Sequence, residues 1–139
     1  MIFDSFSQKD TEEFAAELGK KAVTGDFFAL IGSLGAGKTA FARGFARGMG
    51  IDAHITSPTF TIVNEYRGAL LPLYHFDVYR IANADEMYDT GYEEYFYAGG
   101  VCLVEWADMI EEILPPNAII VRIEQISENG RRITIRGTK

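Results

Sequence analysis

The stretch GSLGAGKT at residues 32–39 decides how the rest of the chain is interpreted, because it matches the phosphate-binding pattern G-x-x-x-x-G-K-[ST]. Glycines in such a loop let successive backbone N–H groups turn toward a di- or triphosphate. Lys38 can place its ammonium group against the outer phosphates, and the Thr39 hydroxyl can join the coordination shell of Mg²⁺. The residues expected to bind the nucleotide in this loop are Gly32, Ser33, Leu34, Gly35, Ala36, Gly37, Lys38 and Thr39.

The residues on either side of this loop predict a strand before it and a helix after it. Residues 26–31 (DFFALI) are a short, mostly apolar run bounded by glycines, as in a buried parallel strand. Residues 40–49 place Phe41, Phe45 and Met49 at helical spacing, with arginines on another face. The helix would direct its positive end at a bound anion. This context favours a nucleotide site over a glycine-rich turn that binds nothing.

Further strands are expected along the rest of the chain. Residues 2–6 are typical of a short edge strand, and Ser7 is typical of the N-cap of the helix that follows. Residues 101–104 (VCLV) form a second buried strand. Antiparallel pairs are expected at 60–66 with 70–76 and at 118–126 with 131–136. Asn129 and Gly130 predict a type I′ turn in the second pair.

Short helices are expected around Gly91, within residues 83–100, and over residues 107–114, where two prolines end the pattern. No linker or repeat interrupts the chain, so we expect a single domain over residues 1–139. The fold class is α/β, a three-layer fold like that of P-loop NTPases. Its mixed sheet should have a parallel core and antiparallel edge strands.

Composition narrows the classes of function. The 139 residues carry a formal net charge of −7, which argues against a broadly basic surface that grips nucleic acid by itself. The single cysteine, Cys102, lies in an apolar run and is expected to be a small buried hydrophobe. No apolar run approaches the length of a membrane span, and the first residues lack a basic-then-apolar signal pattern. A cytoplasmic protein without a membrane role is therefore expected.

Two carboxylates are candidates for completing a Mg²⁺ site opposite the loop. Glu105 follows four apolar residues, at the carboxyl end of a buried strand, where ligands bind in open α/β sheets. Asp77 occupies a similar position after the mixed run 73–76. Either side chain could bind the metal while the other orients the attacking water, and Glu105 is preferred as the metal ligand.

The segment SPTF at residues 57–60 follows the helix at the place where switch loops of nucleotide hydrolases usually lie. A hydroxyl there, such as that of Thr59, could reach Mg²⁺ or the terminal phosphate. An ordinary loop that enters a strand explains the same residues. Guanine-specific hydrolases normally carry an Asn/Thr-Lys-x-Asp element, and no lysine here precedes an aspartate by two residues. ATP is therefore preferred over GTP.

The aromatic and imidazole side chains carry less information. His54 and His75 have neither cysteines nor clustered acids at zinc-like spacing, so packing or loop polarity is the expected role of both. Trp106 directly follows Glu105, which makes it a candidate for holding that carboxylate's orientation.

Four segments together resemble the bacterial TsaE family: GSLGAGKT at 32–39, SPTF at 57–60, HFDVYR at 75–80 and EW at 105–106. The resemblance covers essentially the whole chain, and the last three motifs are far more specific than the first. One departure is Ser33, where many members have aspartate, inside the variable part of the loop.

The resemblance implies a Mg²⁺-dependent ATPase that supports the TsaD–TsaB complex in placing threonylcarbamoyl on tRNA adenosine, with tRNA reached only through that complex. It also implies that Lys38 and Thr39 serve phosphate and Mg²⁺, that Glu105 serves Mg²⁺, and that Asp77 is an essential acid. Either Asp77 or Thr59 would position the water. Thr11 and Arg131 match positions that approach the adenine.

Two other functions stay open. A small-molecule kinase uses the same loop but needs an acceptor pocket and usually a lid, for which this chain has little length. A nucleotide-gated interaction module with negligible hydrolysis would use the acidic, tyrosine-rich residues 83–100 as a partner surface. Product analysis separates the kinase, which makes a phosphorylated metabolite rather than free phosphate.

Overall fold

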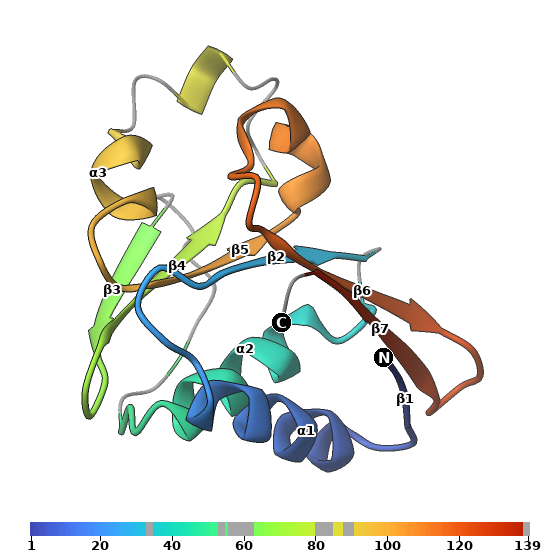
Figure 1. The fold of residues 1–139 in the computed structure, drawn as a ribbon. Helices are drawn as coiled ribbons and strands as arrows, with labels where there is room; N and C mark the ends of the chain where they lie inside the picture. The colour runs from blue at the N-terminus through green and yellow to red at the C-terminus, as the bar shows by residue number, and fades with distance from the viewer. Residues whose placement is uncertain (33–34, 53–54, 56–62, 80–84, 88–90, 138–139) are drawn as a thin grey trace.

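The computed structural model describes residues 1–32, 35–52, 55, 63–79, 85–87 and 91–137, and the following statements concern those residues. They form one mixed sheet of seven strands in the order β1-β7-β6-β2-β5-β4-β3 (Figure 1). The strands are β1 (Ile2–Ser5), β2 (Phe27–Ile31), β3 (Val63–Arg67), β4 (Pro72–Asp77), β5 (Val101–Glu105), β6 (Ile119–Gln125) and β7 (Arg131–Arg136).

The sheet has the predicted division between a parallel core and antiparallel edges. Strand β2 pairs in parallel with both β5 and β6, and β4 pairs in parallel with β5. Strands β1, β7 and β3 add antiparallel pairs at the two sides. The central strands are apolar on both faces, since residues of β2 and β5 alternate between two separate cores.

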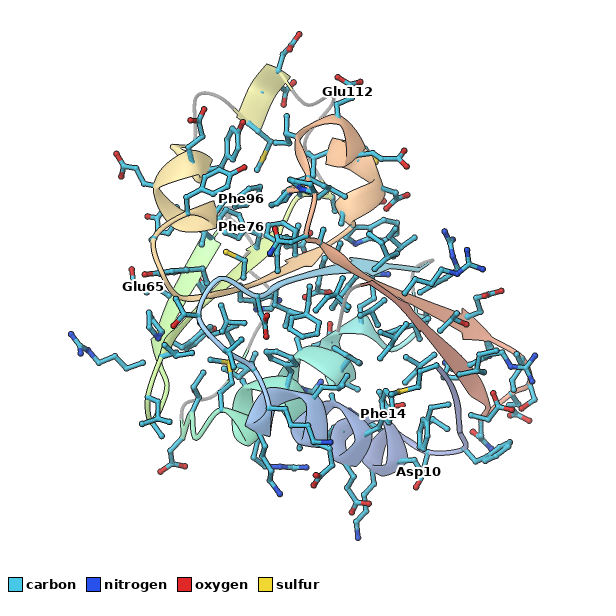
Figure 2. All side chains as sticks on the ribbon, viewed as in Figure 1. Asp10, Phe14, Glu65, Phe76, Phe96 and Glu112 are labelled. Atoms are coloured by element: carbon cyan, nitrogen blue, oxygen red, sulfur yellow. The ribbon has the colours of Figure 1, made fainter. Side chains whose placement is uncertain are left out.

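Helices cover both faces of this sheet (Figure 1). Helices α1 (Gln8–Lys20) and α2 (Lys38–Gly48) lie against one face, and α3 (Tyr92–Phe96) and the 3₁₀ helix η2 (Ala107–Ile113) lie against the other. Phe76 of β4 and Phe96 of α3 pack edge to face in the second core, with ring centroids 5.2 Å apart (Figure 2). The expected three-layer α/β architecture is therefore confirmed.

Local chemistry sets where α1 begins and how closely it approaches α2. The Ser7 hydroxyl accepts a hydrogen bond from the Asp10 N–H (3.0 Å), which is the predicted N-cap. In α2, Gly44 and Gly48 face α1 so closely that an added Cβ would collide with the carbonyl oxygens of Glu12 and Ala16. The missing side chains thus allow the two helix backbones to pack against each other.

The prediction of a type I′ turn at Asn129 and Gly130 is wrong. That turn needs a positive φ at both residues, and neither has one. The β6–β7 ladder ends at the pair Gln125–Arg131, and the Ser127 hydroxyl accepts a hydrogen bond from the Gly130 N–H (2.9 Å). A local side-chain hydrogen bond therefore organises a longer loop over residues 126–130.

Candidate active site

Glycines shape the described part of the 32–39 loop and the start of α2. Gly35 and Gly37 have φ values of 79° and 106°, in the left-handed region that favours glycine. Gly32 passes so close to β6 that an added Cβ would lie 2.6 Å from the Ile123 carbonyl oxygen. Helix α2 has glycine at its N-cap and no acidic residue in its first turn, which leaves the positive end of the helix dipole without a charged side chain of its own helix to offset it.

Asp77 and Glu105 end neighbouring strands and form a register pair between β4 and β5. Leu73, on the same face of β4 as Asp77, and Leu103, on the same face of β5 as Glu105, both belong to the core beneath α1 and α2. Since side chains alternate along a strand, both carboxylates emerge on the side of the sheet that carries α2.

These carboxylates and the loop surround one hollow of about 310 Å³. Its lining residues are Gly35, Gly37, Lys38, Thr39, Asp77, Glu105 and Trp106. The structure thus brings together Gly35, Gly37, Lys38, Thr39, Asp77 and Glu105 of the residues that the sequence assigned to phosphate, metal or catalysis. Gly32 and Ala36, assigned to the nucleotide as well, do not line this hollow, and Ala36 is buried in the core. Thr59, Ser33 and Leu34, also assigned to the site, lie outside the described residues, as do His54 and the rest of segment 57–60.

Lys38 is buried at the floor of this hollow. Its Nζ donates a hydrogen bond to the Gly32 carbonyl oxygen (2.6 Å) and lies 4.0 Å from the centroid of the Trp106 ring. Burial lowers the pKa of Lys38, and the negative charges of Glu105, Asp77 and Asp108 oppose that shift. The ammonium group is therefore partly desolvated, and three carboxylates lie near enough to act on its charge.

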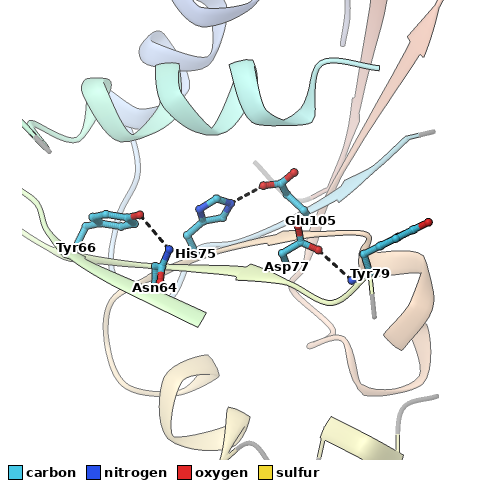
Figure 3. A network of polar contacts seen from close by, with 6 residues as sticks. All are labelled: Asn64, Tyr66, His75, Asp77, Tyr79 and Glu105. Carbon is cyan, nitrogen blue, oxygen red and sulfur yellow. Dashed lines mark hydrogen bonds and ion pairs between the residues drawn. The ribbon is translucent and has the colours of Figure 1, made fainter. Parts of the chain in front are cut away.

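Asp77 occupies a partly desolvated position. Burial raises the pKa of its carboxyl group, and a hydrogen bond from the Tyr79 N–H to Oδ1 (3.0 Å) acts in the opposite direction. The nearby Glu105 carboxylate also raises this pKa. Figure 3 shows the Asp77–Tyr79 contact next to Glu105.

Glu105 is almost fully buried, and its Oε2 lies 2.6 Å from Nε2 of His75. His75 is fully buried on β4, two residues before Asp77 and on the same face (Figure 3). Sequence reasoning missed this partnership, although the two-residue spacing from Asp77 was a usable signal once β4 and β5 were expected to be neighbours. The described ring contacts of Trp106 are with Lys38 and Tyr79, so an orienting role of Trp106 toward Glu105 stays a prediction.

A second hollow of about 320 Å³ shares Gly37 with the first. Thr11 and Arg131, the two residues expected near adenine, both line it. Thr11 is buried and exchanges a hydrogen bond with the Ser5 hydroxyl (2.7 Å). Arg131 donates from Nη2 to the Gly35 carbonyl oxygen (3.3 Å), which connects β7 to the loop.

The oxygen donors in the first hollow suit Mg²⁺, which needs few protein ligands, better than they suit a metal that is coordinated by protein side chains alone. In the part of the chain that the structure describes, no group of three or more His, Cys, Asp and Glu side chains could hold a metal ion. Mg²⁺ commonly takes one or two protein oxygens and completes its shell with phosphates and water. The Thr39 hydroxyl and the Glu105 carboxylate, both at this hollow, are such donors.

Among the described residues, no helix is long and apolar enough to cross a membrane.

Comparison with known proteins gives consistent matches over most of the chain. The family model for the threonylcarbamoyl adenosine biosynthesis protein TsaE matches residues 5–133. The tRNA threonylcarbamoyladenosine biosynthesis protein TsaE of Bacillus subtilis is 48% identical over 126 residues, which cover 91% of this chain and 78% of that protein. Its counterpart in Treponema pallidum is 39% identical over 131 residues, covering 94% and 96%.

A solved structure agrees with these matches. The crystal structure of YdiB from Bacillus subtilis superimposes with a TM-score of 0.83 at 40% sequence identity, covering all of this chain and 86% of that one. The chain therefore belongs to the TsaE family of tRNA threonylcarbamoyladenosine biosynthesis proteins.

Proposed function

We propose that this protein is a Mg²⁺-dependent ATPase that acts as an accessory subunit of the TsaD–TsaB complex in tRNA threonylcarbamoyladenosine modification. The observation that carries the proposal is the single hollow in which Lys38, Thr39, Asp77 and Glu105 meet at the carboxyl ends of parallel strands. Membership of the TsaE family supports the pathway. The partner complex, indirect contact with tRNA and a cytoplasmic location are parts of this proposal.

Different residues of the hollow bind the phosphates and the Mg²⁺ ion. The N–H groups at the start of α2 and the Lys38 ammonium group bind the phosphates and neutralise the negative charge that grows during transfer. The Thr39 hydroxyl and the Glu105 carboxylate hold Mg²⁺, which when bound withdraws charge from the phosphate oxygens. Because Lys38 sits in a poorly solvated place, its charge acts strongly on a bound phosphate.

Asp77 orients the attacking water. Its carboxylate lines the hollow beside Glu105, and the Tyr79 N–H fixes one of its oxygens. Thr59 is the alternative for this role. The adenine lies in the second hollow against Thr11 and Arg131, since that hollow continues from the phosphate site at Gly37. ATP is the expected nucleotide.

Phosphate release from Mg·ATP, measured with and without the TsaD–TsaB pair, tests the proposal. We expect slow release by the protein alone, stimulation by the pair, and loss of both in Lys38→Ala. Lys9→Ala, which alters an exposed lysine of α1, is the matched control and should keep full activity. A Lys38→Ala protein that stays folded and fully active would contradict the assignment of this hollow. If the product were a phosphorylated small molecule and not free phosphate, the protein would be a kinase and the ATPase proposal would be wrong.

A further inference from the structure

We infer that His75 is a positioning residue whose imidazole sets the direction of the Glu105 carboxylate in the hollow. The inference rests on the proposed nucleotide function, because it assigns a purpose to the orientation of Glu105. It adds His75 to the residues of the proposed site, whereas the sequence predicted only packing or loop polarity for this histidine.

The position of His75 in the sheet makes this contact a fixed one. Strand β4 lies between β3 and β5, and His75 is in register with Asn64 on one side and Leu103 on the other. Glu105 is two residues beyond Leu103 and emerges on the same face, so the imidazole reaches it diagonally across the pair of strands. Figure 3 shows both side chains directed toward α2, joined by the contact of 2.6 Å.

The chemistry of the pair indicates which atom donates. A carboxylate that binds a metal only accepts hydrogen bonds, so in that role of Glu105 the Nε2–H of His75 would donate to Oε2. A carboxylate that is 2% exposed needs such a donor, because burying an unpartnered charge is costly. The imidazole therefore gives this buried carboxylate a hydrogen-bond partner that fixes one of its oxygens.

Packing alone does not account for a histidine at this position. His75 is 0% exposed, and its Nδ1 has no hydrogen-bond partner among the described residues. Leaving a buried ring nitrogen unpaired lowers stability, and an apolar side chain of similar volume would avoid that cost. The feature that only the imidazole supplies here is the hydrogen bond to Glu105.

The direction of the Glu105 carboxylate matters because its charge acts on the ammonium group of Lys38. Glu105 is the first of the acids that act on the Lys38 ammonium group, so the two charges attract one another. While His75 holds Oε2, Lys38 Nζ donates to the Gly32 carbonyl oxygen. His75 thus fixes one oxygen of the carboxylate whose charge acts on Lys38, so the direction of Glu105 bears on both the proposed metal ligand and the proposed phosphate-binding lysine.

Two amide variants separate this role from a merely structural one. In His75→Gln the side-chain amide nitrogen stands as many bonds from Cα as Nε2 does, so it can still donate to Glu105. In His75→Asn the amide is one bond shorter and cannot reach. Tyr66→Phe is the matched control, since it removes a hydroxyl from the neighbouring Asn64–Tyr66 contact without touching Glu105 (Figure 3).

The measurement is the affinity for the non-hydrolysable β,γ-imido analogue of ATP, with Mg²⁺ and with EDTA, alongside thermal unfolding of each variant. We expect similar affinities in EDTA for all proteins. The gain on adding Mg²⁺ should fall about 10-fold in His75→Asn, at the low end of the usual effect of such partners, and be largely kept in His75→Gln and Tyr66→Phe.

Two results would overturn the inference in different ways. If the unmodified protein binds the analogue with a Mg²⁺-dependent gain and His75→Asn keeps that gain, the positioning role is wrong and the proposed function stands. If the unmodified protein shows no Mg²⁺-dependent binding, the proposed function fails and the inference fails with it. Since both amides are polar and of related size, a difference in the Mg²⁺-dependent gain between them cannot come from lost packing alone.

Discussion

The Lys38 ammonium group lies 4.0 Å from the centroid of the Trp106 ring, within the range of a cation–π interaction. Trp106 directly follows Glu105 and adopts a left-handed backbone conformation, with φ of 62°, the one positive φ among the described residues other than glycine. Its ring also contacts Tyr79, at a centroid distance of 4.6 Å. The end of β5 thus places both a carboxylate and an indole close to the same lysine.

Trp106 should report directly on nucleotide binding. It is the single tryptophan of the chain, so the intrinsic indole emission comes from this site. A phosphate bound by Lys38 would draw its ammonium group away from the ring and so change the surroundings of the indole. We expect a saturable change in tryptophan emission when ATP is added, and none in Lys38→Ala at the same concentrations. An emission that does not respond to ATP in a protein that binds it would contradict this coupling.

The close approach of α1 and α2 predicts an unusual response to alanine. Gly48→Ala raises intrinsic helix propensity, which favours folding by about 1 kcal/mol. The new methyl group would collide with the Ala16 carbonyl oxygen, a backbone atom that cannot move alone, and overpacking of this kind costs about 1–3 kcal/mol. We expect the collision to prevail and the free energy of unfolding in urea to decrease.

Arg47→Ala, at the adjacent and exposed position of α2, is the control and should change stability by no more than about 0.5 kcal/mol. A Gly48→Ala protein that is more stable than the unmodified chain would mean that the helices can separate without loss.

The sequence predicted the fold and the candidate site most successfully where a short local pattern determines both. The apolar runs of β2 and β5 predicted buried parallel strands, and the acids at the ends of β4 and β5 predicted that Asp77 and Glu105 would meet. Both inferences depend on the period of a strand and on the edge of the sheet where parallel strands end. Both features can be recognised in short stretches of sequence.

What sequence reasoning missed depends on contacts between distant residues. His75 and Glu105 are 30 residues apart, and their contact follows only from the pairing of β4 with β5 and from the burial of both side chains. The 126–130 loop was misjudged because the Asn129-Gly130 pattern outweighed a serine whose hydroxyl binds the backbone. Thr11 and Arg131 were connected to the site by family resemblance, since no local pattern brings α1 and β7 together.

The pair formed by Asp4 and Arg132 predicts a pH dependence of stability. Arg132 donates to both Asp4 oxygens, from Nε at 2.8 Å and from Nη2 at 3.1 Å, across the β1–β7 register pair. This hydrogen bonding lowers the pKa of Asp4 below its ordinary value of about 3.9. A lowered pKa in the folded state stabilises the protein above the ordinary pKa, and that contribution is lost as the pH falls through the folded value.

Asp4→Asn should therefore have a lower melting temperature than the unmodified protein at pH 7, by a small amount because the pair is exposed. The difference should shrink as the pH is lowered below about 3.9, and high salt should reduce it at neutral pH. Melting curves at pH 7, 5 and 3 measure this. A difference of the same size at pH 7 and pH 3 would show that the charge of Asp4 is not its source.

Two adjacent arginines of β7 should have separate roles. Arg131 lines the second hollow and donates to the Gly35 carbonyl oxygen, whereas Arg132 pairs with Asp4 at the sheet edge. We expect Arg131→Ala to weaken ATP binding about 5-fold or more, which corresponds to losing one hydrogen bond worth about 1 kcal/mol. Arg132→Ala should keep the affinity and lose only the contribution of the Asp4 pair to stability. Calorimetric titration with ATP measures the first effect, and thermal unfolding measures the second. Equal ATP affinities in both variants would remove Arg131 from the nucleotide site and leave the second hollow without a role in binding adenine.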